Sequence, residues 1–234
     1  MYRAIGIIPA RMESTRFPGK PLAEIAGRPM LWHVCKNVAQ SKMIYPHYVA
    51  TDSPEIIEAC ASWGVGTIPT ARSCRTGTER VHDAMRQLSD REGDIIVNIQ
   101  GDEPTIRPES LDALTEAFAD TRVKIASLYY CPVQASDIGD RNRVKVLVDG
   151  SGDALFFTRT ATAPLWRLYG VHVGVYAYRR EILSKLVKLP QSGDLEQVVW
   201  MQSGYAIRMV ETGYATASVD APEDVARVEE IILR

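Results

Sequence analysis

One loop near the start of the chain concentrates positive charge. It spans residues 9–21, follows a short apolar run, and holds three cations against one acid: Arg11, Arg16, Lys20 and Glu13. Small residues such as Ser14 and Gly19 let backbone N–H groups approach a ligand closely, and backbone donors with Arg and Lys are what a polyphosphate requires. The alternative is a solvated basic loop that binds nothing. Three prolines stiffen the loop, which a merely connecting segment would not need, and this disfavours the alternative. The loop matches neither G-x-x-x-x-G-K-[ST] nor G-x-G-x-x-G. It predicts a phosphate site of another kind, with nucleotide contacts from Ala10, Arg11, Ser14 and Lys20.

Two aspartates follow apolar segments and are candidate metal ligands. Asp102 comes just after the buried run 95–100, and Asp220 comes after 215–219. A carboxylate beside a triphosphate site suits Mg²⁺, which prefers one or two carboxylates plus phosphate oxygens. The alternatives are a turn aspartate at Asp102 and the start of a helix at Asp220. Arg11, Lys20 and Asp102 are therefore candidate catalytic residues, and Asp102 and Asp220 are candidate Mg²⁺ ligands, with these alternatives open.

A small-residue segment at a predicted helix start could contact the same ligand. Thr76, Gly77 and Thr78 lie between a strand and a helix, where hydroxyl groups and a glycine can hold a base edge or a phosphate. A simple helix cap is the alternative. His172 lies in a strand-like segment, and its periodicity leaves open whether it faces core or cleft.

Short β-type runs alternate with helical patterns through the first half of the chain. Strands are expected at 4–8, 47–51, 65–68 and 95–100, and helices at 30–38, 54–63, 79–88 and 108–119. Ser53 and Pro54 are typical of a helix cap and first turn. This alternation predicts a parallel sheet covered on both faces. Ligands of such sheets bind beyond the carboxyl ends of the strands, where the candidate residues fall.

The second half is richer in strands. They are expected at 125–131, 144–148, 154–158, 171–178 and 206–210, with helices at 180–189, 194–202 and 222–233. The pattern predicts a three-layer α/β fold with a mixed, mostly parallel sheet and a small β-rich insertion, as a single domain over residues 1–234.

Composition excludes several classes of protein. The 27 Lys and Arg against 29 Asp and Glu give a net charge of −2, which argues against a nucleic-acid or membrane-surface protein. With 46% hydrophobic and 24% charged residues, the chain has the balance of an ordinary globular protein. No apolar run approaches a membrane span, and the start lacks the pattern of a signal peptide, so a cytoplasmic protein is expected. The four cysteines form no C-x-x-C pair.

Ordered motifs along nearly the whole chain resemble the 3-deoxy-manno-octulosonate (KDO) cytidylyltransferase family. They are I-P-A-R (8–11), P-G-K-P-L (18–22), V-A-T-D (49–52), G-T-E-R (77–80), V-N-I-Q-G-D-E-P (97–104), V-K-V (144–146), H-V-G-V-Y-A-Y-R (172–179), L-E-Q (195–197) and V-D-A-P-E-D (219–224). The first loop is shared by many sugar nucleotidyltransferases, and the Q-G-D-E-P segment is much more specific.

The resemblance implies a nucleotidyltransferase fold, a homodimer, and CMP transfer from CTP to a 3-deoxy-ulosonic acid. The product would be an activated sugar for lipopolysaccharide or other cell-surface polysaccharide. It assigns the triphosphate to Arg11 and Lys20 and magnesium to Asp102 and Asp220. Sugar-acid contacts carry over to Arg80, Gln100, His172, Glu196 and Gln197, with His172 expected to donate a hydrogen bond.

Two segments are shorter than the family pattern: residues 159–171 and the stretch before Leu195. This leaves the sugar open between KDO, an 8-amino analogue and another nonulosonic acid. Two alternative functions stay open. The chain could be a related enzyme, either a sialic-type CMP-sugar synthetase or a sugar-1-phosphate nucleotidyltransferase. It could also be a nucleotide-binding protein without catalytic activity.

Overall fold

The chain folds into two compact units in the structure, a computed structural model that describes residues 4–14, 16–89, 93–131, 139–160, 168–190 and 195–234. The first unit contains Met1–Asp112 and Thr216–Arg234, and the second contains Ala113–Ala215. No helix among the described residues has the length and apolar character needed to cross a membrane. That all 234 residues form one domain stays a prediction from the sequence.

Four parallel strands form the sheet of the first unit. Their order is β6 (Ile95–Asn98), β1 (Ala4–Pro9), β4 (Ile44–Thr51) and β5 (Thr67–Pro69). In register, Ile7 of β1 lies beside Tyr48 of β4 and Asn98 of β6. Strands β1 and β6 are buried almost throughout, as expected of parallel strands that helices cover on both faces. The parallel register brings the four carboxyl ends to one edge.

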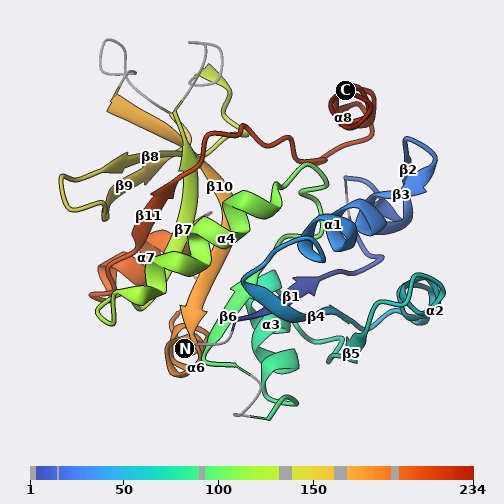
Figure 1. Cartoon of the computed structure of the whole chain (residues 1–234), viewed down its shortest axis with the longest axis horizontal. Coiled ribbons are helices and arrows are strands. Elements are labelled where there is room, and N and C mark those ends of the chain that lie inside the picture. Colours follow the sequence, from blue (N-terminus) through green and yellow to red (C-terminus); the bar gives the residue numbers. More distant parts are fainter. Residues whose placement is uncertain (1–3, 15, 90–92, 132–138, 161–167, 191–194) are drawn as a thin grey trace. The chain divides into compact units, whose positions relative to one another are not determined.

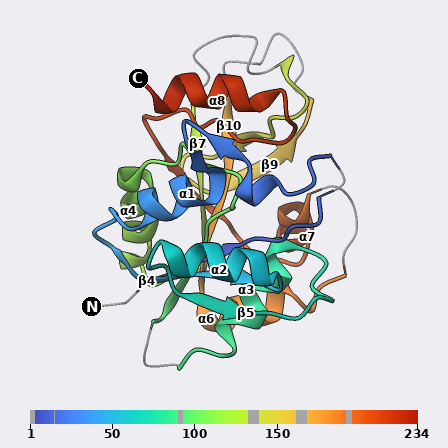
Figure 2. The same cartoon turned by 90° about the vertical axis from the view of Figure 1, so that its right-hand side faces the viewer.

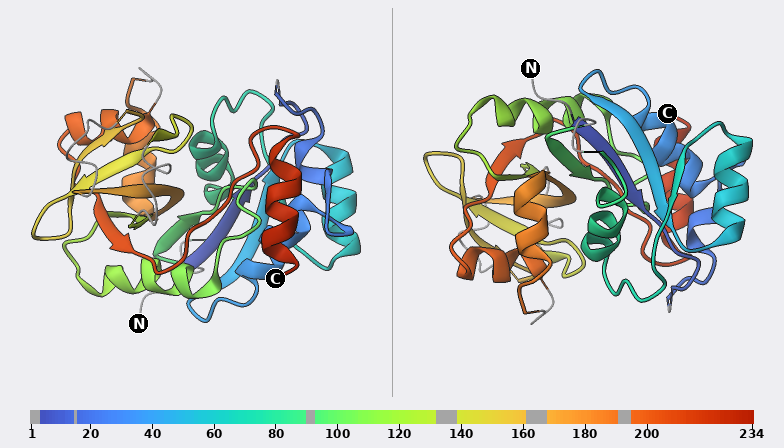
Figure 3. Two further views of the ribbon diagram at one scale, coloured as in Figure 1. Left: turned by 90° about the horizontal axis from the view of Figure 1, so that it is seen from above. Right: turned by 90° about the horizontal axis from the view of Figure 1, so that it is seen from below.

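Helices cover this sheet on both faces (Figure 3). One face carries α1 (Met30–Val38) and α2 (Pro54–Ser62), and the other carries α3 (Gly77–Met85). The predicted cap of α2 is confirmed, because Ser53 Oγ accepts a hydrogen bond from the Ile56 backbone N–H at 3.3 Å. Figure 1 labels the following helix α4 (Pro108–Glu116), which continues as the 3₁₀ turn η2 (Ala117–Ala119).

A small hairpin and the last helix complete the first unit (Figure 2). The hairpin, β2 (Glu24–Ile25) and β3 (Arg28–Pro29), follows the 3₁₀ turn η1 (Lys20–Leu22) and was not predicted. Helix α8 (Asp224–Ile232) packs against it, and the Ala26 backbone N–H donates to Glu229 Oε1 at 2.9 Å. The preceding segment 215–219 forms no regular strand, although an apolar run was noted there.

The second unit is built mainly of strands. Its strands are β7 (Ile125–Tyr130), β8 (Lys145–Val148), β9 (Ala154–Thr158), β10 (Tyr169–Arg179) and β11 (Arg208–Glu211). Strand β10 is antiparallel to β7 and β8, β9 is antiparallel to β8, and β11 is parallel to β7. The helices are α6 (Arg180–Leu186) and α7 (Glu196–Gln202). The expected class, an α/β fold with mixed strand pairing and a β-rich insertion, is confirmed.

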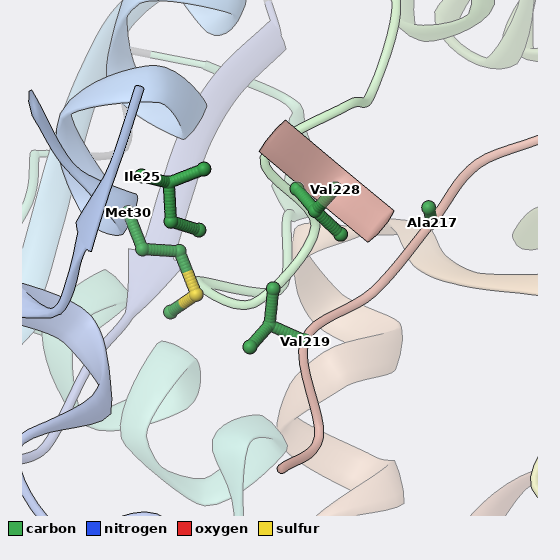
Figure 4. Packing of buried hydrophobic residues seen from close by; sticks show 5 residues of the cluster. All are labelled: Ile25, Met30, Ala217, Val219 and Val228. Atoms are coloured by element: carbon green, nitrogen blue, oxygen red, sulfur yellow. The ribbon is translucent and has the colours of Figure 1, made fainter. Parts of the chain in front are cut away.

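A buried apolar cluster joins the end of the chain to the start of α1. Figure 4 shows Ile25, Met30, Ala217, Val219 and Val228, which are between 0% and 4% exposed. The cluster anchors the irregular segment before α8. Asp220 follows directly after Val219, so this packing also determines where Asp220 lies.

We expect Val228→Ala to lower the free energy of unfolding by about 2 kcal/mol, because it removes two buried methyl groups and leaves a cavity. The matched control is Leu233→Ala at the end of the same helix, where the side chain is 71% exposed. Urea denaturation of both variants measures the difference. Equal, small effects would contradict the role of the cluster.

Candidate active site

A pocket of about 830 Å³ lies at the carboxyl edge of the first unit's parallel strands. Its wall comes from the loop after β1, the loop before α3 and its first turn, the residues after β6, and Asp220. This is the position at which open α/β sheets bind ligands. All of the nucleotide residues expected from the sequence line the pocket except Thr78, which is buried in the first turn of α3.

The loop after β1 is folded back on itself by backbone hydrogen bonds. The Gly19 N–H donates to Met12 O at 3.1 Å, and Gly19 has a φ of 73°, a left-handed conformation that glycine adopts without strain. Ser14 Oγ accepts a hydrogen bond from the Phe17 N–H at 3.3 Å. This folding carries Lys20 back to the strand edge, where its ammonium group enters the pocket wall.

Lys20 joins three segments of the chain. Its Nζ donates to Asp102 Oδ2 at 2.7 Å and to Val219 O at 2.9 Å. The side chains of Lys20 and Asp102 are 15% and 31% exposed, so the pair is accessible from the pocket. The sequence predicted both residues at this edge, and the structure places them in direct contact.

Asp220 is also paired with a cation of the loop. Arg16 Nη2 donates to Asp220 Oδ1 at 2.9 Å in an exposed ion pair. Helix α8 begins at Asp224, with Glu223 at its N-cap position and no side-chain hydrogen bond capping it. The Asp224 Oδ2 accepts from the backbone N–H groups of Asp220 and Ala221, in the segment before the helix. The Asp220 carboxylate is therefore not used as a helix cap and lies in the pocket wall.

The acid next to Asp102 in the chain, Glu103, is buried and neutral at pH 7. Glu103 is 8% exposed, and burial together with the charges of Asp102 and Asp220 raises its pKa to about 8. No group of three or more acidic, histidine or cysteine side chains that could hold a metal occurs in the described residues. Two carboxylates at one phosphate pocket nevertheless suit Mg²⁺ that arrives with a nucleotide, because Mg²⁺ takes its other ligands from phosphate and water.

The start of α3 forms the opposite part of the wall. Thr76 Oγ1 caps the helix by accepting from the Glu79 N–H at 3.2 Å. A Cβ at Gly77 would lie 3.4 Å from both Gln100 Oε1 and Pro9 Cγ, so glycine permits a close approach of three segments. A Cβ at Gly101 would lie 2.9 Å from Pro9 O, which excludes a larger residue beside Asp102 without a backbone shift.

Arg80 and Gln100, two of the expected sugar-acid residues, also line this pocket. Arg80 Nη1 lies 3.1 Å from Asp52 Oδ1 and donates to Thr70 Oγ1 at 2.6 Å. Gln100 Nε2 donates to Asn98 Oδ1 at 3.4 Å. Sequence reasoning gave Asp52 and Thr70 no role. Both residues directly follow a strand, Asp52 after β4 and Thr70 after β5, and this position in the sequence could have identified them as residues of the ligand edge.

The other expected sugar-acid residues, His172, Glu196 and Gln197, belong to the second unit. His172 of β10 lies against Phe157 and Tyr176, with ring centroids 5.2 and 5.3 Å away. Glu196 and Gln197 begin α7, and Gln197 is buried. Trp200 of the same helix contacts Tyr176 edge-on at 5.1 Å. The aromatic cluster thus connects β10 with α7.

A buried hydroxyl group lies beside the His172 ring. Ser127 Oγ donates to Val175 O at 2.8 Å and lies 2.9 Å from His172 Nε2. In a neutral imidazole one ring nitrogen donates and the other accepts. Burial lowers the pKa of the ring to about 3. That His172 donates a hydrogen bond to the sugar acid stays a prediction from the sequence.

The shortened segments named in the sequence analysis fall largely outside the described residues, which omit 161–167 and 191–194. Nothing in the described part of the chain tests their effect on the choice of sugar.

Together, the parallel sheet and the basic loop with acids at its carboxyl edge define a nucleotide-binding α/β enzyme. Residues 5–212 match the cytidylyltransferase family, and the chain belongs to it. Among its curated relatives, the 3-deoxy-manno-octulosonate cytidylyltransferase of Nitratidesulfovibrio vulgaris is 43% identical over 94% of this chain and 92% of the relative. The enzyme of that name from Syntrophus aciditrophicus is 39% identical over 100% and 98% of the two chains.

Solved structures give the same fold. CMP:2-keto-3-deoxy-manno-octonic acid synthetase in complex with CTP superposes with a TM-score of 0.90 at 35% identity, covering 99% of this chain and 98% of that one. A putative glucose-1-phosphate thymidylyltransferase from Bacillus anthracis has a TM-score of 0.74 at 16% identity, covering 97% and 94%. The second likeness concerns the fold alone.

We expect His172 to make stability depend on pH. Its pKa falls from 6.5 in the unfolded chain to about 3 in the folded one, so below pH 6.5 only the unfolded state takes up the proton. The contribution of the neutral ring to the free energy of unfolding is fully present above pH 6.5. It falls as the pH drops from 6.5 toward 3, by up to about 1.4 kcal/mol per pH unit.

Urea denaturation at pH 7.5 and 5.5, comparing the wild type with His172→Gln, measures this dependence. The wild type should lose more stability than the variant on acidification. Equal losses in the two proteins would show that His172 titrates normally in the folded state.

Proposed function

We propose that this protein transfers CMP from CTP to 3-deoxy-manno-octulosonate or a close analogue and releases pyrophosphate. The observation that carries the proposal is the Lys20–Asp102 pair at the strand edge of an 830 Å³ pocket, in a chain whose relatives bear the name of this activity. The product would supply lipopolysaccharide or other cell-surface polysaccharide synthesis. A cytoplasmic location stays a prediction from the sequence.

The chemistry follows from the charges around the pocket. A hydroxyl of the sugar acid attacks the α-phosphorus of CTP in line, and pyrophosphate leaves with its charge. Arg11 and Lys20 neutralise that charge, because both line the pocket on the loop after β1. Asp102 and Asp220 would hold Mg²⁺, which supplies further positive charge at the phosphates. No covalent enzyme intermediate is needed.

The ion pairs of the pocket wall also have a role in this scheme. Lys20 pairs with Asp102, and Arg16 pairs with Asp220, so each carboxylate is neutralised by a loop cation. Nucleotide with its metal brings phosphate oxygens for the cations and a cation for the carboxylates. Each charged group therefore exchanges one partner for another, and none is left buried and unpaired.

We also propose that the protein is a homodimer. Strand β9 pairs only with β8 in the described residues, and Leu155 and Phe156 of this edge strand are 55% and 53% exposed. Covering such an edge removes unpaired backbone groups and apolar surface from water. A mass twice that of the single chain in light scattering tests this state.

The proposed activity is tested by measuring pyrophosphate release with a panel of nucleotides and sugars. CTP with 3-deoxy-manno-octulosonate should give turnover, and ATP, GTP or UTP with the same sugar should not. Turnover with a sialic-type acid or an 8-amino analogue alone would reassign the sugar. Turnover with a sugar 1-phosphate would place the protein in another class of nucleotidyltransferase, and no turnover with any pair would indicate a non-catalytic binding protein.

Asp102→Asn should reduce kcat by about a hundredfold or more while the fold persists, because the neutral amide binds Mg²⁺ weakly and no longer opposes Lys20. The matched control is Asp94→Asn, an exposed aspartate just before the other end of β6. Steady-state kinetics at several Mg²⁺ concentrations with a melting curve check the result. Near-normal kcat at moderate Mg²⁺ would exclude the metal role.

Lys20→Ala should raise KM for CTP on the order of tenfold or more, with a smaller change in KM for the sugar, because a phosphate-facing charge is lost. Lys36→Ala provides the control, since Lys36 is an exposed cation on α1. If both kinetic constants for CTP stay unchanged in folded Lys20→Ala protein, the basic loop is not the triphosphate site.

A further inference from the structure

Asp52 is a carboxylate at the ligand edge of the sheet that the proposed chemistry leaves unused. It directly follows β4 and precedes α2, but the cap of that helix is the neighbouring Ser53. Its Oδ1 lies 3.1 Å from Arg80 Nη1, and its side chain is 18% exposed. The carboxylate therefore acts on the arginine and not on the helix start.

Thr70 holds the same nitrogen of Arg80. Its Oγ1 accepts from Arg80 Nη1 at 2.6 Å, and its own backbone N–H donates to Thr51 O at 2.9 Å. The two acceptors thus come from the ends of adjacent paired strands, β4 and β5. A guanidinium group is planar and rigid, so two fixed acceptors on one nitrogen restrict the orientation of the whole fork.

Arg80 is also part of the pocket wall. Arg80 lines the pocket, although its side chain is only 4% exposed. Its positive charge contributes to lowering the pKa of Glu13 and opposes the upward shift at Cys74, and both of these residues line the pocket as well. The charge is therefore felt inside the pocket, where the guanidinium suits anionic oxygens.

Asp52 also makes the buried position of Arg80 possible. A buried guanidinium without a counter-charge is strongly unfavourable, and the adjacent carboxylate offsets this. The other acid whose pKa Arg80 affects, Glu13, is paired with Arg72 at 2.5 Å in an exposed contact. Asp52 is thus the acid that holds Arg80 in the ligand-free site.

We propose that Asp52, together with Thr70, is a positioning residue that orients Arg80 to bind anionic oxygens of the sugar acid. The inference rests on the proposed function, in which Arg80 contacts the sugar acid. Asp52 itself touches neither substrate. Its effect reaches the reaction only through the direction of the Arg80 fork.

Asp52→Asn tests this role, because it keeps the size of the side chain and one acceptor oxygen but removes the charge. We expect KM for the sugar acid to rise on the order of tenfold, with KM for CTP changed less than about twofold. Asp52→Glu, which restores the charge, should recover part of the loss. Equal changes in the two KM values would overturn the proposal.

Asp83→Asn is the matched control. Asp83 Oδ2 accepts from the Ala71 N–H at 2.8 Å, so it holds the same loop as Thr70 without contacting Arg80. If Asp83→Asn raises KM for the sugar acid as much as Asp52→Asn does, loop order explains the effect and the proposal fails. Melting curves accompany all variants. Should Asp52→Asn fail to fold, Thr70→Val carries the test, with a smaller rise in the same KM expected.

A double-mutant cycle with Arg80→Gln isolates the route of the effect. In the Arg80→Gln background, Asp52→Asn should no longer change KM for the sugar acid. A full effect in that background would show that Asp52 acts independently of Arg80, and would overturn the inference alone. Absence of wild-type turnover with CTP and the sugar acid would overturn the proposed function, and this inference with it.

Discussion

The ammonium group of Lys20 ties together the segments from which the pocket is built. It donates to Asp102 after β6 and to Val219 before α8, while the Val219 N–H donates to Asp102 O. Segments from the beginning, middle and end of the sequence thus meet at one charge. The apolar cluster around Val228 supports the same junction from beneath. Moving Lys20 would release the Asp102 carboxylate and the Val219 carbonyl, which directly precedes Asp220.

Parallel strand order explains why the charged residues gather at one edge. The carboxyl ends of β6, β1, β4 and β5 lie together, so the residues that follow each strand meet although they are far apart in sequence. Lys20, Asp52, Thr70 and Asp102 all follow this rule. Lys20, Arg16 and Arg80 each have a paired carboxylate, which offsets the cost of partly burying these charges.

Much of the fold could be predicted because local patterns and tertiary packing agree. Ser53 and Pro54 define the start of α2, and the all-apolar runs of β1 and β6 require cover on both faces. The hairpin β2–β3 could not be predicted, since its strands have two residues each and carry no periodicity. In the segment 215–219, Ala217 and Val219 pack into a core cluster, and the segment forms no strand of the sheet.

The sequence alone determined the chemistry that is present: a basic loop, acids after apolar strands, and motifs of one cytidylyltransferase family. Residue type and chain spacing are sufficient for this, because both are local properties. Only the tertiary structure decided which groups are partners. It paired Lys20 with Asp102 and Arg16 with Asp220, and it placed Asp52 and Thr70 on one nitrogen of Arg80. It also placed Ser127 Oγ 2.9 Å from Nε2 of His172. Such choices depend on distances of a few ångströms between segments remote in sequence, which no local pattern records.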